Sequence, residues 1–127
     1  MASLGFNVIQ SVDREAREAR WPRTSAEKLF NHDTPTAGLV CAIVNVEPGA
    51  TVPLHYHAVE TIEYVTGGKA RVRDRHGNEV VVAAESILHF PPGPDAAHEW
   101  TALGNSPLQV LFIYAAPPGE HDGLRRL

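Results

Sequence analysis

From residue 38 to residue 115 the chain is a series of short apolar runs separated by Gly, Pro and Asn. Short apolar runs bounded by turn residues are typical of β-strands, and many of them in succession predict a β-sandwich or barrel. No segment of useful length repeats its apolar residues with the period of a helix. We therefore predict an all-β domain with seven or eight strands in this region, at residues 38–46, 51–57, 61–66, 69–73, 79–83, 86–90, 98–101 and 108–115.

The regions on either side of this series differ in composition. At 127 residues the chain fits one domain, in which we expect an N-terminal arm with a strand and a charged segment (1–35), a barrel (36–116) and a loose tail (117–127). Acidic and basic residues alternate over 13–20, which we interpret as an exposed lead-in with a short helical turn. The alternative is an arm that covers a partner subunit, with Trp21 as its anchor.

Composition restricts the classes of binding partner and the cellular compartment. The net charge of −4 gives no basic footprint for nucleic acid, and no segment approaches the roughly 18 apolar residues of a membrane span. The only cysteine, Cys41, forms no intramolecular disulfide and is interpreted as a small apolar residue; residues 1–10 lack the pattern of a secretory signal. We therefore expect a cytoplasmic protein without a nucleic-acid or membrane partner. Exposed edge strands favour a homodimer.

Two histidines two residues apart, His55 and His57, occupy one predicted strand. A strand turns every second side chain to the same face and rises about 3.3 Å per residue, so both imidazoles project from one face with Cα atoms about 6.6 Å apart. Two imidazoles so placed can converge on one cation at about 2.0–2.1 Å from each nitrogen. A third histidine, His98, follows a turn rich in proline and begins a later predicted strand.

The spacing of these residues resembles the first motif of a small single-domain cupin. That motif reads Gly, five residues, His-x-His, three or four residues, Glu, six residues, Gly. Gly49, His55, His57 and Gly68 fall in register with it.

The second cupin motif reads Gly, five residues, Pro-x-Gly, two residues, His, three residues, Asn, and is matched more loosely. Pro91 and Gly93 fit, but His98 follows Gly93 after four residues instead of two. Glu85 stands in place of the first glycine and Ala102 in place of the asparagine. The resemblance covers the predicted barrel region and implies a double-stranded β-helix, or jelly-roll barrel, with a metal inside the barrel mouth.

The acid of the first motif is displaced. Thr61 takes the register position of the family's glutamate, while acids stand at Glu60 and Glu63. If Thr61 faces the barrel, strand alternation turns Glu63 inward too, and a carboxylate in apolar surroundings is costly unless it is paired or bound to a cation. An inward Glu63 is therefore either a fourth metal ligand or a general base beside a metal held by three histidines.

Other residues receive plainer interpretations. Glu60 is interpreted as a solvated loop acid, and His89 as either a core-edge histidine or an additional ligand that replaces the missing glutamate. Trp100 shares a strand face with His98 and is expected to form a wall of the substrate pocket. The remaining histidines lie in polar or turn-rich contexts and are interpreted as surface residues: His32, His76 and His121.

The resemblance implies one divalent transition metal, Fe, Zn, Ni or Mn, with His55, His57, His98 and Glu63 as the candidate ligands. A redox-active ion would support oxygenation, as in many similar cupins. A Lewis-acidic ion would polarise a carbonyl while Glu63 moves a proton, giving cyclisation, isomerisation or lyase chemistry. We therefore expect a metal-dependent enzyme acting on a small organic molecule, aromatic or polyketide-like. The alternative is a non-catalytic cupin that binds or senses a small ligand.

Overall fold

The computed structural model describes residues 4–30, 38–115 and 124–126. These residues form β-strands and two short 3₁₀ helices, and none of their helices is long and apolar enough to cross a membrane. In chain order the elements are η1 (Ser11–Asp13), β1 (Arg17–Glu18), β2 (Thr24–Phe30), β3 (Leu39–Val46), β4 (Thr51–His57), β5 (Thr61–Gly67), β6 (Lys69–Asp74), β7 (Glu79–Ala83), β8 (Ile87–Phe90), η2 (Pro94–Ala96), β9 (His98–Leu103), β10 (Leu108–Ala115) and β11 (Leu124–Arg126).

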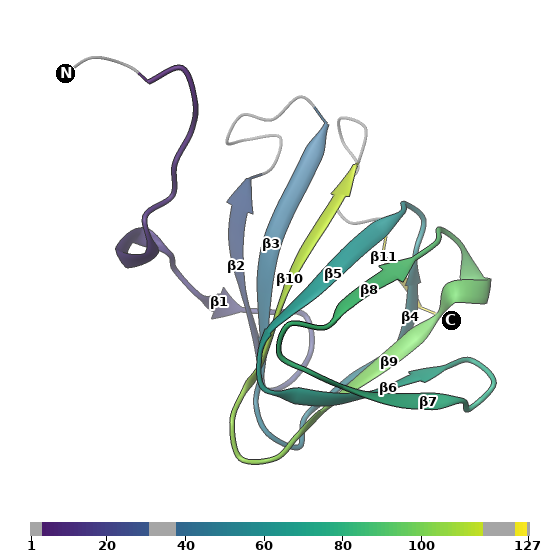
Figure 1. The fold of residues 1–127 in the computed structure, drawn as a ribbon. Coiled ribbons are helices and arrows are strands. Elements are labelled where there is room, and N and C mark those ends of the chain that lie inside the picture. Colours follow the sequence, from purple (N-terminus) through teal and green to yellow (C-terminus); the bar gives the residue numbers. More distant parts are fainter. Residues whose placement is uncertain (1–3, 31–37, 116–123, 127) are drawn as a thin grey trace.

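The strands form two antiparallel sheets that face each other. One sheet has the order β1-β2-β3-β10-β5-β8 and the other the order β11-β4-β9-β6-β7. Figure 1 shows the sheets meeting at one end and diverging at the other, as in a jelly-roll barrel. Alternate side chains of the strands fill the space between the sheets, where the core includes Val46, Val65, Ala70, Trp100 and Leu108. The predicted all-β jelly roll is confirmed, and its eight strands between residues 38 and 115 agree closely with β3 to β10.

The N-terminal region differs from the prediction in one respect. The helical turn expected within residues 13–20 is wrong, because Arg17–Glu18 form β1 and pair with β2, while the short helix lies earlier, at Ser11–Asp13. β2 in turn pairs along β3 and belongs to the barrel sheet. The expected boundary between residues 35 and 36 lies outside the described residues, as do His32 and His121.

The C-terminal region also contributes to the barrel. We expected residues 117–127 to be a loose tail, but Leu124–Arg126 form β11 and pair with β4 opposite His55 and His57. Residues 117–123 and residue 127 lie outside the described residues. The Arg126 guanidinium lies 5.0 Å from the ring centroid of Trp21, so β11 contacts the segment that precedes β2. Trp21 thus packs within its own chain.

Gly68 lies in the β5–β6 turn, where the β9–β10 connection passes too close to leave room for a side chain. It links β5 to β6 with φ of +79°, a conformation that L side chains rarely adopt. A Cβ atom at this position would collide with the carbonyl oxygen of Pro107 and lie 2.8 Å from Leu108 Cα. The closing glycine of the first motif therefore lets the β9–β10 connection pass directly over this turn.

We predict that Gly68→Ala lowers the free energy of unfolding by about 3 kcal/mol, since it adds backbone collision to the cost of a positive φ. Gly77→Ala is the matched control, because Gly77 has φ of +87° and open space around its Cα. The control is expected to cost about 1 kcal/mol. Urea denaturation followed by circular dichroism measures both, and equal losses in the two variants would contradict the proposed collision.

Candidate metal centre

An irregularity in β4 turns its two histidines into the barrel. Val52 pairs with Trp100 and His55 with His98, so β4 uses three residues where β9 uses two. Pro53 stands in this bulge, where its missing N–H leaves no ladder hydrogen bond unsatisfied. The extra residue shifts the inward and outward alternation of side chains by one position. Val52 is buried before the bulge, and His55 and His57 are buried after it. The bulge therefore aligns the His-x-His pair with the apolar interior.

His98 reaches the same place from β9. The amide of Gly93 donates to the carbonyl oxygen of His57 at 2.9 Å, and η2 then occupies residues Pro94–Ala96. This short helix takes up the two residues by which the second motif is longer than the family pattern. His98 consequently starts β9 directly opposite His55 and is only 2 % exposed.

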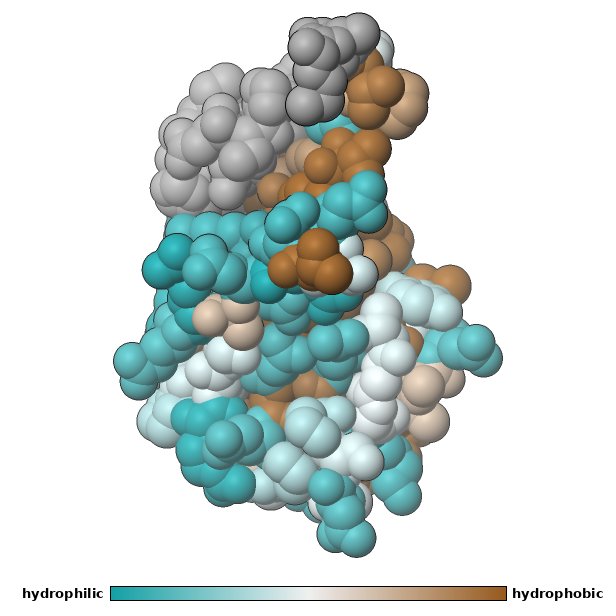
Figure 2. Space-filling model, turned by 90° about the vertical axis from the view of Figure 1, so that its left-hand side faces the viewer, coloured by the Kyte–Doolittle hydropathy of each residue, from teal (hydrophilic) through white to brown (hydrophobic). Residues whose placement is uncertain are grey.

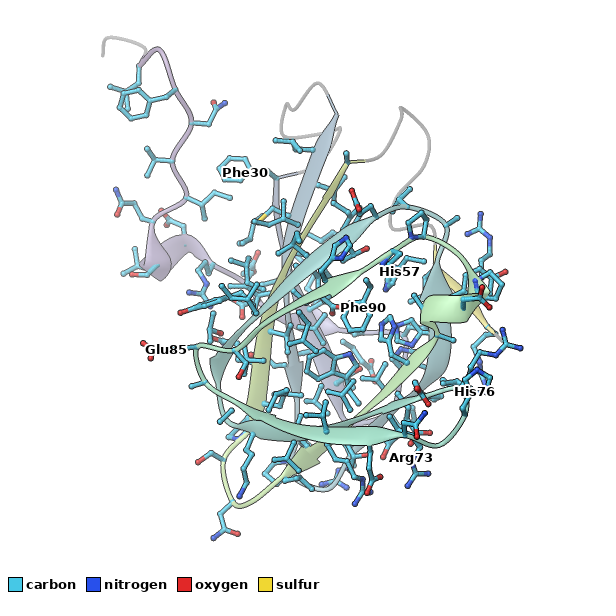
Figure 3. All side chains as sticks on the ribbon, turned by 45° about the vertical axis from the view of Figure 1, so that its right-hand side comes forward. Phe30, His57, Arg73, His76, Glu85 and Phe90 are labelled. Carbon is cyan, nitrogen blue, oxygen red and sulfur yellow. The ribbon has the colours of Figure 1, made fainter. Side chains whose placement is uncertain are left out.

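The three imidazoles form one compact, buried cluster. Nitrogen atoms of His55, His57 and His98, one from each ring, all lie within 4.8 Å of one another. The ring of Phe90 stacks on His98 with centroids 3.8 Å apart, which fixes the plane of that imidazole. Figure 3 shows His57 and Phe90 between the sheets, with His76 at the periphery. Small rotations of the side chains bring three such nitrogens to the bond length of a single ion, about 2.0–2.1 Å.

Backbone carbonyls set the tautomers of two of these rings. His55 Nδ1 lies 2.7 Å from the carbonyl oxygen of Pro53, and His98 Nδ1 lies 2.8 Å from that of Ala96. A carbonyl oxygen only accepts hydrogen bonds, so each Nδ1 carries the proton and donates it. The lone pair is then on Nε2, from which the imidazole can bind a metal.

Glu63 completes the polar cluster. Its side chain is 4 % exposed, and its Oε2 lies 3.7 Å from His98 Nε2. Among the described residues these two atoms have no hydrogen-bond partner, although both are buried. Buried polar atoms without partners are rare and costly, and a cation between them would satisfy both. The residues present therefore fit a divalent metal.

Burial controls the protonation of this cluster when no cation is bound. Desolvation raises the pKa of the Glu63 carboxyl to about 8. Desolvation and the neighbouring imidazole of His55 lower the pKa of His98 to about 3, although its hydrogen bond to the Ala96 carbonyl acts in the opposite direction. Both groups are therefore neutral near pH 7, so their 3.7 Å contact is not an ion pair. A bound cation would favour the carboxylate form of Glu63.

The structure separates the other acid and histidine candidates from the cluster. Thr61 is buried beside Glu63 on the inner face of β5, as strand alternation predicts, and its hydroxyl donates to the Val59 carbonyl at 3.3 Å. Glu60 and His89 are exposed and contact each other at 2.8 Å. Neither lines the cavity that contains the histidines. His76 is exposed, as expected.

A cavity of about 450 Å³ opens beside the histidine cluster. His55, His57 and Glu63 lie on its wall, and Trp100 forms part of that wall, as the sequence predicts. Trp21 and Lys28 also line the cavity, which the sequence pattern did not predict. The signal for Lys28 is weak, because Thr24, Ala26 and Lys28 alternate inward along a strand with little apolar character.

Two facing antiparallel sheets with buried histidines on their inner surface define a jelly-roll barrel with a candidate metal site. A family model described as the cupin domain matches residues 42–114, more than half of the chain. The chain therefore belongs to the cupin family. No curated protein matches it.

Solved structures agree on the fold. The chain is similar to the polyketide cyclase RemF from Streptomyces resistomycificus, with 20 % identity, a TM-score of 0.80 and coverage of 96 % of this chain and 85 % of that one. It is also similar to KdgF from Halomonas sp., with 17 % identity, a TM-score of 0.73 and coverage of 89 % and 96 %. A third similar structure is an RmlC-like cupin from Shewanella frigidimarina, with 18 % identity, a TM-score of 0.69 and coverage of 92 % and 95 %. At these identities the likeness concerns the fold alone.

We predict that Glu63 makes the metal-free protein less stable as pH rises from about 7 to about 8. Because the folded-state pKa of Glu63 lies above its value of 4.5 in the unfolded chain, only the folded chain keeps this proton in that window. The free energy of unfolding should fall by about 1 kcal/mol per pH unit, and Glu63→Gln should remove the slope. The His98 contribution lies at lower pH, below about 6.5.

Denaturation of chelator-treated protein at several pH values measures this slope. Glu60→Gln is the control, since Glu60 has an exposed side chain immediately before the same strand. A slope that survives Glu63→Gln would contradict a protonated, buried Glu63.

Proposed function

We propose that the chain is a metal-dependent cupin enzyme that acts on a small organic molecule in the barrel cavity. One observation carries this proposal: three buried imidazoles converge beside a buried carboxyl, and Glu63 Oε2 and His98 Nε2 have no hydrogen-bond partner among the described residues. Buried titratable groups in a cavity are typical of catalytic sites.

In this proposal His55, His57 and His98 hold one divalent ion, Fe, Zn, Ni or Mn, through nitrogen lone pairs. When bound, the ion supplies either Lewis-acid polarisation of a substrate oxygen or redox chemistry. Thr61 offers a hydroxyl where the family motif has a carboxylate, and that hydroxyl donates a hydrogen bond to the Val59 carbonyl oxygen. A coordination position therefore stays open to water or substrate.

Glu63 is the proposed proton-transfer residue. Its carboxyl lies on the cavity wall and 3.7 Å from His98, which places it beside any molecule at the histidine cluster. A carboxyl with a pKa near 8 holds a proton at neutral pH and can return it to a substrate atom, or accept one once a cation lowers that pKa. The apolar walls exclude water and favour proton transfer directly between Glu63 and substrate.

Two reaction types remain within the proposal, oxygenation and Lewis-acid cyclisation or isomerisation. The similarity to a polyketide cyclase supports cyclisation. Oxygen uptake by the metal-loaded protein with phenolic and keto substrates distinguishes the two. Stoichiometric zinc without oxygen uptake would exclude oxygenation, whereas uptake with iron would exclude a purely Lewis-acidic role.

We predict that the purified protein retains about one equivalent of a divalent transition metal and that His98→Ala loses it, because two remaining imidazoles bind far more weakly. Elemental analysis after dialysis measures the stoichiometry. His76→Ala is the matched control, since His76 is an exposed histidine in the β6–β7 turn.

The same measurement assigns the role of Glu63. A Glu63→Gln variant that keeps the metal but loses turnover supports a proton-transfer role, and one that loses the metal identifies Glu63 as a ligand. Metal retained by His98→Ala at the wild-type level would contradict the site. Ligand binding without turnover in the metal-loaded wild type would favour the binding or sensor alternative.

We further propose a homodimer formed through the outer face of the six-stranded sheet. Large apolar side chains are exposed there: Ile62 and Ile113 pair across β5 and β10, and Ile87 follows on β8. Apolar faces of this kind on small proteins mark interfaces. Figure 2 views the molecule from the side of the N-terminal segment, where further hydrophobic residues are exposed in the upper half.

We also propose that the protein is cytoplasmic, because its single cysteine forms no intramolecular disulfide.

We predict that Ile113→Asp converts the dimer to a monomer, because it places a charge at the centre of the buried face. Sedimentation velocity measures the change. Val81→Asp is the control, since Val81 is also an exposed apolar residue and lies on β7 of the other sheet. A wild-type protein that sediments as a monomer at micromolar concentration would contradict the proposal.

A further inference from the structure

The described charged side chains on the cavity wall are more often basic than acidic. Among the described residues, the charged side chains that line the cavity, apart from the buried Glu63 and the histidines, are Arg20 and Lys28, both basic. The whole chain, by contrast, is acidic, with 15 Asp and Glu against 11 Lys and Arg. The remaining wall is mostly apolar and includes Val44, Val110 and Phe112. The cavity thus combines an apolar interior with basic side chains that the overall composition does not predict.

The register of the six-stranded sheet places Lys28 and Glu63 in one row. Lys28 pairs with Ala42, Ala42 pairs with Phe112, and Phe112 pairs with Glu63. The row crosses three strand spacings, so the two Cα atoms are about 14 Å apart along the sheet. Glu63 is buried at one end of this row and Lys28 is exposed at the other. A ligand that lies along the row would therefore have the histidine cluster at one end and an ammonium group at the other.

Within the part of the chain that the structure describes, no carboxylate competes for Lys28. The acid next to it in sequence, Glu27, lies on the opposite side of β2, where Arg14 donates to it at 2.7 Å and Asn45 at 3.0 Å. Among the described residues no acid forms an ion pair with Lys28. Its alkyl stem covers apolar surface while the ammonium group stays at the cavity mouth.

Further basic side chains lie near the start of β2, about four residues along the strand from Lys28. Arg20 and Trp21 precede β2 and line the cavity, and the Arg126 guanidinium from β11 lies 5.0 Å from the Trp21 ring centroid. Basic groups gathered at an opening attract anions and raise their local concentration. The segments before β2 and at β11 therefore add basic charge beside the cavity to that of Lys28 on β2.

We propose that the cavity binds a mostly apolar organic molecule with one anionic group, which Lys28 holds at the mouth while the apolar body extends toward the histidine cluster. That such a molecule is also a substrate rests on the proposed function. The binding preference itself needs no metal. Lys28 acts as a specificity-determining residue, because an apolar cavity alone would favour the uncharged analogue of any such molecule.

The test compares 4-phenylbutanoate with its uncharged amide, 4-phenylbutanamide, on chelator-treated full-length protein. Tryptophan fluorescence reports binding, since Trp21 and Trp100 both line the cavity. We expect the wild type to bind the acid about fivefold to tenfold more tightly than the amide, with a preference that decreases at high salt. Lys28→Met should abolish the preference without weakening amide binding, and Lys28→Arg should restore it.

Lys69→Met is the control, because Lys69 is an exposed strand lysine outside the cavity. Equal binding of acid and amide by the wild type, or no binding of the acid at millimolar concentration, would overturn the proposal. A preference that persists in Lys28→Met would also overturn it. Because the protein is metal-free in every arm, these outcomes are independent of whether the histidines hold a metal.

Discussion

The desolvation of four polar side chains in one apolar barrel is the constraint on which this structure depends. His55, His57, His98 and Glu63 are each at most 6 % exposed. Removing such groups from water is costly, and the cost is tolerable only when they are neutral, hydrogen-bonded or bound to a cation. Two imidazoles donate to backbone carbonyls, while Glu63 and His98 retain buried atoms without partners among the described residues. A divalent ion at their centre would offset this cost.

Several features of the backbone serve this cluster. The bulge at Pro53 turns the His-x-His pair inward, and η2 sets His98 opposite His55. Phe90 then holds the His98 ring in a stack. The same sheet register that buries Glu63 places Lys28 at the far end of its row. One arrangement of strands therefore sets both the candidate metal site and its distance from Lys28.

Much of the barrel was predictable from the sequence because the strands between residues 38 and 115 are short, apolar and bounded by turn residues. The inward direction of Glu63 followed from strand alternation with Thr61. β2 and β11 were harder to predict, since their pairing depends on distant strands and their own residues are largely polar. Lys28, Arg20 and Trp21 belong to the cavity only because these terminal segments fold onto the barrel, which no local pattern encodes.

The most direct test of the account is a crystal structure of the metal-loaded protein with anomalous diffraction recorded at the absorption edge of the metal. The account predicts a single strong peak about 2.0–2.1 Å from the nitrogens of His55, His57 and His98, beside Glu63. A peak at exposed histidines, or no peak among these three imidazoles at full metal loading, would contradict it.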